Sequence, residues 1–366
     1  PQNEPILGYL EGSSERILLN KELERQSQTV VDIPLIIGGK EIRTGNLGEI
    51  RMPHDHNKVI ATYHKAGKAQ VEMAIQAALE ARTTWSNMTW TIRASILLKA
   101  AHLIASCYRP VLNAATMLGQ SKNIYQSEID AVCETIDFLK YNVGFAGRIY
   151  EMQPKSAYNQ LNRMEYRALE GFVLAVSPFN FTSIASNLNM APVMMGNTTI
   201  WKPASTAVLS NYYLMKVFME AGLPAGVINF MPGQGSVIGN TCLDSKDLAG
   251  IHFTGSNGTF NGLLTRVSTN LSGYKSYPRL VGETGGKDFI FVHPSAKIHD
   301  VCINAILGAF EYQGQKCSAA SRMYVPRSLW GGMKKCLCEL AEDIKMGDVK
   351  DVRNFMNAVI GQKAFD

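Results

Sequence analysis

Two segments of the chain carry side chains of the kind used in covalent catalysis. Residues 314–319, Gly-Gln-Lys-Cys-Ser-Ala, supply the thiol of Cys317, and residues 282–287, Gly-Glu-Thr-Gly-Gly-Lys, supply the carboxylate of Glu283. A nearby cation lowers the pKa of a thiol, so we expect Lys316 to favour the nucleophilic thiolate. Glycines around Glu283 leave its carboxylate mobile, as a general base requires. Taken singly, however, Cys317 also fits a small core residue and Glu283 a surface turn.

Three further segments place polar groups directly after apolar runs. Residues 177–181, Ser-Pro-Phe-Asn-Phe, contain Asn180, whose amide could hydrogen-bond a developing oxyanion. In residues 201–205, the ammonium of Lys202 could reach a ribose or a phosphate. Residues 253–258 form a Gly/Ser turn that opens a predicted helix, and its free N–H groups suit a pyrophosphate. Each segment also fits an ordinary turn, a solvated lysine or a helix N-cap, so only their combination indicates a site.

The elements that must position these segments alternate between strand and helix from residue 171 to residue 282. This alternation predicts an α/β fold in which βαβ units build a parallel sheet. Ligands bind at the carboxyl ends of such strands, so we expect all of these segments to meet at one edge. The expected strands are 172–177, 198–202, 227–231, 249–254 and 279–282, and the expected helices are 183–194, 206–221 and 256–268.

Four regions follow from the patterning of the 366 residues. Residues 1–150 are expected to form an extended wrap up to about residue 63 and then helices of a dinucleotide-binding domain, including 91–106 and 124–149. Residues 151–168 predict a hairpin or exposed arm for oligomerisation. Residues 169–284 hold the βαβ units of the dinucleotide-binding domain. Residues 285–366 begin a second α/β domain, with strands 288–292 and 322–325 and helices 297–311 and 328–343.

The bulk composition excludes several classes of protein. Hydrophobic residues make up 46% and charged residues 18% of the chain, which is typical of a globular protein and not of a disordered one. The net charge of +5 is scattered, without the basic stripe of a nucleic-acid binder. No apolar run reaches the roughly 18 residues of a membrane span. Seven widely spaced cysteines and no metal-ligand spacing predict a reducing compartment, no disulfide and no bound metal.

The order and combination of the segments resemble the aldehyde dehydrogenase family. The series Ser-Pro-Phe-Asn-Phe, Trp-Lys-Pro, Phe-Thr-Gly-Ser, Glu-Thr-Gly-Gly-Lys and Gly-Gln-Lys-Cys falls between about residue 70 and residue 345. Residues 168–172, 179–182 and 310–319 look most like the branch of that family that oxidises glutamate semialdehyde to glutamate in proline catabolism. The resemblance implies a parallel-sheet dinucleotide-binding domain, a second α/β catalytic domain and an oligomerisation arm.

The resemblance also implies a role for each residue. Cys317 attacks the aldehyde, Asn180 and the Cys317 N–H hold the oxyanion, hydride passes to NAD or NADP, and Glu283 activates the water that hydrolyses the thioester. A homodimer in the mitochondrial matrix is implied as well, although a chain that begins at Pro1 displays no targeting peptide. The resemblance implies that the cofactor is contacted by Ser177, Lys202, Gly255, Ser256, Asn257, Gly258 and Thr259. It implies that the aldehyde is contacted by Phe181 and Ser318, with Glu134 from a helix as a further neighbour or, alternatively, as part of a solvated helix face.

Two departures from the family qualify these implications. Ser205 stands where many NAD-preferring members carry a glutamate, which leaves the choice between NAD and NADP open. The family's Glu-x-Phe-Gly-Pro segment, its carboxylate-anchoring loop and its dimerising strand do not occur in the chain, so we expect an incomplete catalytic domain with weak activity. Two alternatives are a non-catalytic fragment of the family and a reductase of the same fold, such as glutamyl-phosphate reductase. Glu283 argues against the reductase, because a hydrolytic base is useless where water must be kept from the thioester.

Overall fold

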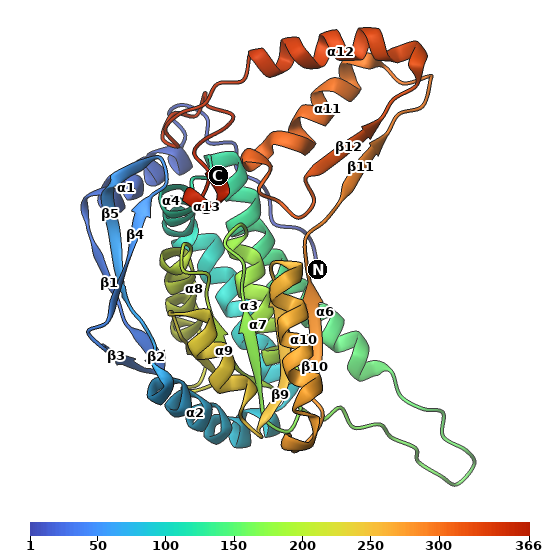
Figure 1. Cartoon of the computed structure of the whole chain (residues 1–366). Coiled ribbons are helices and arrows are strands. Elements are labelled where there is room, and N and C mark those ends of the chain that lie inside the picture. The colour runs from blue at the N-terminus through green and yellow to red at the C-terminus, as the bar shows by residue number, and fades with distance from the viewer.

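A seven-stranded sheet forms the centre of the computed structural model, which describes residues 1–366 (Figure 1). Its strand order is β10-β9-β6-β7-β8-β2-β3, and the strands from β10 to β8 pair in parallel, as expected for βαβ units. The α/β fold predicted from the alternation is therefore confirmed. The parallel strands are β6 (Phe172–Val176), β7 (Thr198–Lys202), β8 (Ile228–Phe230), β9 (Leu248–Thr254) and β10 (Arg279–Glu283); β2 (Leu35–Ile37) and β3 (Lys40–Ile42) are antiparallel.

Helices cover both faces of this sheet, so its central strands are buried on both sides. On one face, buried side chains of α2, α9 and α10 pack on those of the strands, and on the other face α7 and α8 do so. A parallel sheet buried in this way explains why its strands read as continuous apolar runs. The helices are α2 (Lys68–Asn87), α7 (Thr182–Met194), α8 (Val208–Glu220), α9 (Gly235–Leu243) and α10 (Asn257–Thr269); α9 was not expected from the sequence.

A layer of helices packs outside α7 and α8. It contains the expected helical stretches, but two of its helices run into π-helical turns, at Ile104–Tyr108 and Glu128–Cys133. Such turns widen the helix locally and are frequent at functional sites. None of the helices combines the length and the apolar composition that a bilayer crossing requires. The members of this layer are α3 (Trp90–Leu103), α4 (Arg109–Gln120), α5 (Ile124–Ser127) and α6 (Glu134–Glu151).

The N-terminal region is more regular than the extended wrap expected for it. Helix α1 (Ser14–Gln28) starts at Ser13, whose side chain accepts a hydrogen bond from the Arg16 N–H. Only Leu19 and Leu23 bury an apolar side chain from this helix, so it lacks the apolar periodicity that would have revealed it. The prediction for this segment was wrong. A three-stranded sheet follows, made of β1 (Val31–Ile33), β5 (Asp55–His64) and β4 (Leu47–Met52).

Two protruding parts complete the fold (Figure 1). The parallel pair β11 (Asp288–Phe291) and β12 (Ala320–Tyr324), with α11 (Ile298–Phe310) and α12 (Arg327–Glu342), matches the predicted second α/β unit; α13 (Gln362–Phe365) ends the chain. Residues 152–168 contain no strand, so of the two forms expected for this segment the hairpin is wrong and the exposed arm is found. Hydrogen bonds cross the arm between the Gln153 side chain and the Met164 backbone and from Asn162 to Lys155 and Ser156, and the side chains of Tyr158 and Leu161 are exposed.

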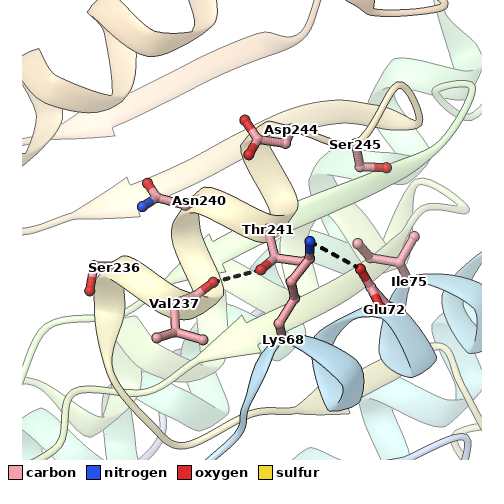
Figure 2. A pocket seen from close by; sticks show the side chains of 9 residues that line it. All are labelled: Lys68, Glu72, Ile75, Ser236, Val237, Asn240, Thr241, Asp244 and Ser245. Atoms are coloured by element: carbon pink, nitrogen blue, oxygen red, sulfur yellow. Dashed lines mark hydrogen bonds and ion pairs between the residues drawn. The ribbon is translucent and has the colours of Figure 1, made fainter.

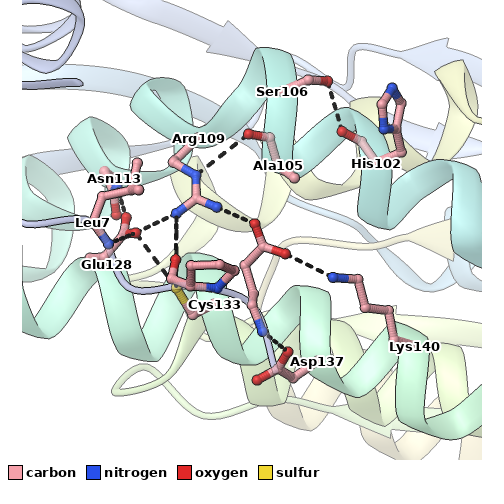
Figure 3. A network of polar contacts seen from close by, with 12 residues as sticks. Leu7, His102, Ala105, Ser106, Arg109, Asn113, Glu128, Cys133, Asp137 and Lys140 are labelled. Carbon is pink, nitrogen blue, oxygen red and sulfur yellow. Dashed lines mark hydrogen bonds and ion pairs between the residues drawn. The ribbon is translucent and has the colours of Figure 1, made fainter. Parts of the chain in front are cut away.

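A buried network of charges fastens the first residues of the chain to the outer helices (Figure 3). The guanidinium of Arg109 pairs with the carboxylates of Glu128 and Glu4. Glu128 also accepts hydrogen bonds from the Leu7 N–H at 3.1 Å and the Tyr9 hydroxyl at 2.8 Å. Because a buried charge is costly unless it is paired, this network depends on all of its members.

We predict that Glu128→Ala lowers the free energy of unfolding by about 3–5 kcal/mol, because it leaves the buried Arg109 with Glu4 alone. Chemical denaturation measures the loss. Glu170→Ala is the matched control, since Glu170 pairs with Arg167 on an exposed surface, and it should change stability by less than about 0.5 kcal/mol. Equal losses in the two variants would show that the buried network contributes no more than a surface ion pair.

Candidate active site

The carboxyl ends of the parallel strands bring the predicted segments together. In the sheet register Val176 lies beside Lys202 and Phe253, and Thr254 lies beside Glu283. The segment 177–181, the lysine that ends β7, the Gly/Ser turn after β9 and the glutamate that ends β10 therefore emerge at the same edge. The expected convergence is confirmed for these four segments.

The thiol and the carboxylate are in contact. The Cys317 Sγ donates to Glu283 Oε1 across 3.6 Å, although the two residues are 34 positions apart. The approach depends on Gly286, because a Cβ atom there would lie 1.8 Å from the Cys317 carbonyl oxygen. Only glycine lets the two segments come this close. The structure thus pairs the two residues whose chemistry suggested a nucleophile and a base.

Asn180 joins this pair from the other side. Its Nδ2 donates to the Gln315 carbonyl oxygen at 3.0 Å, two residues before the nucleophile. A side-chain amide has two N–H donors, so the second remains for another acceptor. The predicted oxyanion donor is therefore fastened to the backbone that carries Cys317.

The turn before Cys317 has a backbone conformation that the sequence did not indicate. Tyr312, Gln313 and Gly314 follow one another with φ of 51°, 57° and 68°, and this left-handed region is unfavourable for the first two residues. The surrounding structure holds them there. The Tyr312 hydroxyl donates to the Gln120 carbonyl at 2.7 Å, and the Gln313 side chain donates to the Ala358 carbonyl at 2.8 Å.

A cavity of about 400 Å³ opens over the thiol. Besides Cys317 and Glu283 it is lined by Phe181, Ser318 and Glu134, so the residues named for the aldehyde pocket do share one space. A wider groove of about 660 Å³ lies between α2 and α9 (Figure 2), but it contains neither a thiol nor a histidine. We therefore take the smaller cavity as the reaction site.

Two ionisable side chains in this cavity are tuned by burial. Burial raises the pKa of Glu134, while a hydrogen bond of 2.8 Å from the Ser183 hydroxyl opposes the rise. Burial lowers the pKa of His252, whose Nδ1 lies 3.0 Å from the Leu188 carbonyl oxygen. His252 was not predicted as a site residue, although it lies one residue before Phe253 on an expected strand that ends at the site.

The expected effect of Lys316 on the nucleophile is wrong. Its ammonium turns away to Glu311 at 2.8 Å and Asp130 at 3.2 Å. Burial raises the pKa of the Cys317 thiol, and the neighbouring Glu283 carboxylate raises it further. Adjacency in sequence did not reveal this, because the partners that orient the lysine lie on other elements. The resting thiol is consequently protonated more readily than an ordinary cysteine.

The residues predicted to bind the cofactor lie at the same edge of the sheet, and they differ in how far their side chains are buried and hydrogen-bonded. Ser177 is buried, and its hydroxyl accepts a hydrogen bond of 3.0 Å from the Trp201 indole. Burial lowers the pKa of Lys202, which lies near Gly235 at the start of α9. The remaining candidates are Gly255, Ser256, Asn257, Gly258 and Thr259, which form the first turn of α10 and the two residues before it.

The start of α10 is tied to the glutamate segment. Ser256 caps the helix by accepting from the Thr259 N–H at 3.3 Å, and the Asn257 side chain accepts from the Gly285 N–H at 3.1 Å. The N–H groups of the first helical turn have no acceptor within the helix and suit an anion. No three His, Cys, Asp or Glu side chains gather where they could hold a metal ion.

Comparison with known proteins now decides the family. Residues 43–366 match the sequence pattern of the aldehyde dehydrogenase family. The chain belongs to the aldehyde dehydrogenase family. The resemblance drawn from the order of the motifs is thereby confirmed.

The whole chain is similar in sequence to several proteins that are named as delta-1-pyrroline-5-carboxylate dehydrogenases. The chain is 47% identical to the mitochondrial delta-1-pyrroline-5-carboxylate dehydrogenase of Dictyostelium discoideum and 48% identical to delta-1-pyrroline-5-carboxylate dehydrogenase of Agaricus bisporus, and it covers 66% and 67% of those proteins. The solved delta-pyrroline-5-carboxylate dehydrogenase from Mycobacterium tuberculosis bound with NAD has 47% identity and a TM-score of 0.98, over 100% of this chain and 68% of that chain. The chain thus spans about two thirds of the length of these relatives.

We predict that alkylation of Cys317 by iodoacetamide rises with pH through a midpoint above that of an ordinary thiol, because burial and Glu283 raise its pKa. Glu283→Gln removes a negative charge that disfavours the thiolate, so the midpoint should move to lower pH. Mass spectrometry of the labelled peptide measures both curves, with the exposed Cys107 as the reference in each sample. An unchanged midpoint would show that the carboxylate does not act on the thiol.

Proposed function

We propose that this protein oxidises glutamate semialdehyde, the open form of Δ1-pyrroline-5-carboxylate, to glutamate, with NAD as the cofactor, in proline catabolism. The observation that carries the proposal is the contact between Cys317 and Glu283, with Asn180 fastened to the backbone two residues before the thiol. The names of relatives at 47% and 48% identity support the choice of substrate.

Cys317 and Glu283 in the cavity, together with the neighbouring Asn180, supply the groups that move protons and bear charge on the protein side. The thiol of Cys317 loses its proton toward Glu283, and the sulfur bonds to the aldehyde carbon. The carbonyl oxygen becomes an oxyanion, for which the free N–H of the Asn180 amide is a donor. After oxidation the substrate is a thioester on Cys317. Glu283 first releases to solvent the proton that it took from the thiol. It then takes a proton from water, the hydroxide adds to the thioester carbon, the bond from that carbon to sulfur breaks, and the thiolate leaves as the acid forms.

The substrate carries an ammonium and a carboxylate besides its aldehyde, and the cavity offers a partner for the first. Glu134 lines the cavity with the thiol, and its carboxylate is held by the Ser183 hydroxyl at 2.8 Å. A buried carboxylate gains most from a cation that enters beside it. Phe181 and Ser318 line the same cavity and would contact the chain between the two ends of the substrate.

The cofactor residues fit a dinucleotide. The first turn of α10 presents N–H groups suited to phosphate, Gly258 leaves open space beside them, and Lys202 ends β7 at the same edge of the sheet, two strands from β9. The Ser177 hydroxyl accepts from the Trp201 indole and keeps its own O–H to donate to the cofactor, while the Ser177 N–H already donates to the Lys202 carbonyl. When bound, NAD supplies the nicotinamide that accepts hydride from the substrate. Ser205 offers no carboxylate to the adenosine ribose, so NADP belongs in the same assays.

We also propose a homodimer in the mitochondrial matrix. The arm formed by residues 152–168 exposes Tyr158 at 93% and Leu161 at 87%, and it packs on no other part of the chain that would cover them (Figure 1). Exposed apolar side chains on a projecting segment suit pairing with a second copy. The location is supported by relatives that are named as mitochondrial, among them the protein of Dictyostelium discoideum.

The test of the activity is the rate of NADH formation by the purified protein with glutamate semialdehyde, compared with butyraldehyde and with NADP in place of NAD. A preference for glutamate semialdehyde and NAD supports the proposal. Reduction of an acyl phosphate to the aldehyde, without the reverse oxidation, would support the reductase of the same fold. NAD binding without any covalent adduct on Cys317 would support a non-catalytic protein.

We predict that Cys317→Ala lowers aldehyde oxidation by several orders of magnitude, because no other group in the cavity can form the thioester. Dinucleotide affinity should stay within about threefold of the parent, since the cofactor residues lie on other segments. Steady-state rates and calorimetric titration with NAD measure the two effects. Retained turnover would exclude Cys317 as the nucleophile.

We predict that Glu283→Gln slows hydrolysis of the thioester more than its formation, because glutamine cannot accept the proton of water. Rapid mixing with NAD and aldehyde, at a pH where the thiol is ionised, should then show a burst of NADH followed by a slow steady state. Equal slowing of both phases would give Glu283 a positioning role only.

A further inference from the structure

A fully buried lysine lies behind the cavity, and the proposed chemistry does not use it. Lys122 lies between α4 and α5 with no exposed surface, and its Nζ is 2.6 Å from Asp130 Oδ2. Burial lowers the pKa of Lys122, and the Asp130 carboxylate opposes this shift. Apolar residues of similar volume often stabilise a protein as well as a buried ion pair does, so we looked for a role of Lys122 other than stability.

The ammonium of Lys122 lies against two aromatic rings. Its Nζ is 4.4 Å from the ring centroid of Phe181 and 4.4 Å from that of Tyr312. Both distances fall within the range of a cation–π interaction, which is stronger where water is excluded. The ammonium of Lys122 therefore contacts two rings, those of Phe181 and Tyr312, that are 131 residues apart in the chain.

Each ring belongs to one of the two turns that meet at the thiol. Phe181 directly follows Asn180 and is the N-cap residue of α7. Tyr312 begins the left-handed turn that leads to Cys317, and its hydroxyl is fixed to the Gln120 carbonyl at 2.7 Å. Lys122 therefore contacts one ring from the turn that carries the oxyanion donor and one from the turn that carries the nucleophile.

The counter-ion reinforces the same spacing. Asp130 Oδ2 also lies 3.2 Å from the Nζ of Lys316, the residue just before Cys317. The Asp130 carboxylate thereby bridges the ammonium groups of Lys122 and Lys316. Two independent contacts, one through Tyr312 and one through Asp130, connect the buried lysine with the turn that carries the thiol.

We propose that Lys122 is a positioning residue that keeps the Asn180 amide and the Cys317 thiol at the spacing required for oxyanion stabilisation. Its effect on turnover rests on the proposed function. The contacts of Lys122 do not depend on the proposed function. A measurement of the reactivity of the Cys317 thiol can therefore test its positioning separately from a measurement of activity.

The test uses variants that keep the shape of the side chain. Lys122→Met retains an unbranched chain between the rings without the charge, and Lys122→Arg retains a cation that stacks on aromatic faces. Lys99→Met changes an exposed lysine of α3 and serves as the control. Unfolding midpoints are measured for each variant, and all rates are taken at a temperature where it is folded.

The decisive measurement is a double-mutant cycle with Asn180→Ala. Lys122→Met should lower kcat about 10- to 100-fold in the parent, with NAD affinity unchanged. In the Asn180→Ala background the same change should lower kcat by less than about threefold, because the group it positions is already gone. Lys122→Arg should restore a large part of the rate. Equal losses in both backgrounds would overturn the proposal.

A further variant separates positioning from simple charge balance. If Lys122 serves only to neutralise Asp130, the combined change Lys122→Met with Asp130→Asn should return kcat to the parent value. The proposal expects the combined variant to remain slow, because the cation between the rings is still absent. Recovery of the parent rate would overturn it.

A second experiment does not depend on activity and measures the rate of Cys317 alkylation in the absence of cofactor. Loosening the turn should expose the thiol and speed its reaction with iodoacetamide about threefold or more in Lys122→Met, while Cys107 in the same sample reacts as before. Parent-like alkylation of Cys317 would overturn the proposal. If the parent oxidises no aldehyde, the proposed function fails, yet this measurement still decides whether Lys122 positions the thiol.

Discussion

The close approach of two backbones is the constraint on which the reaction site depends. Gly286 lies so near the Cys317 carbonyl that any Cβ atom would collide with it, at 1.8 Å. This packing joins the end of the central sheet to the second α/β unit and leaves Glu283 within 3.6 Å of the thiol. The chemistry of the pair is therefore a result of main-chain packing, and the side chains only make use of it.

The electrostatic surroundings favour a resting state that is not reactive. Burial and the neighbouring Glu283 carboxylate raise the pKa of the Cys317 thiol. The ammonium of the adjacent Lys316 is paired with Asp130 and Glu311. A neutral thiol resists oxidation and adventitious alkylation better than a thiolate. The arrangement delays full nucleophilicity until the site is filled and Glu283 has taken the proton.

Local patterns predicted the elements well and the contacts less well. The parallel strands and their helices followed from apolar runs, and Cys317, Glu283 and Asn180 followed from residue type at the strand ends and in the turns beyond them. Two of the failures, both within the site, share one cause. The orientation of Lys316 and the left-handed turn at Tyr312 depend on contacts with α4 and the π-helical turn after α5, more than 180 residues away in the sequence. Periodicity carries no information on such contacts.

The charged network at the start of the chain has a consequence for the order in which the protein folds. Glu4 bonds to Asp137 across 133 residues, and Leu7 to Glu128 across 121. During synthesis the first residues therefore leave the ribosome long before their partners exist, and they stay undocked while much of the helical layer is made. Docking of this segment therefore has to wait for the outer helices that carry Glu128 and Asp137, although strands β6 to β10 of the central sheet follow still later in the chain.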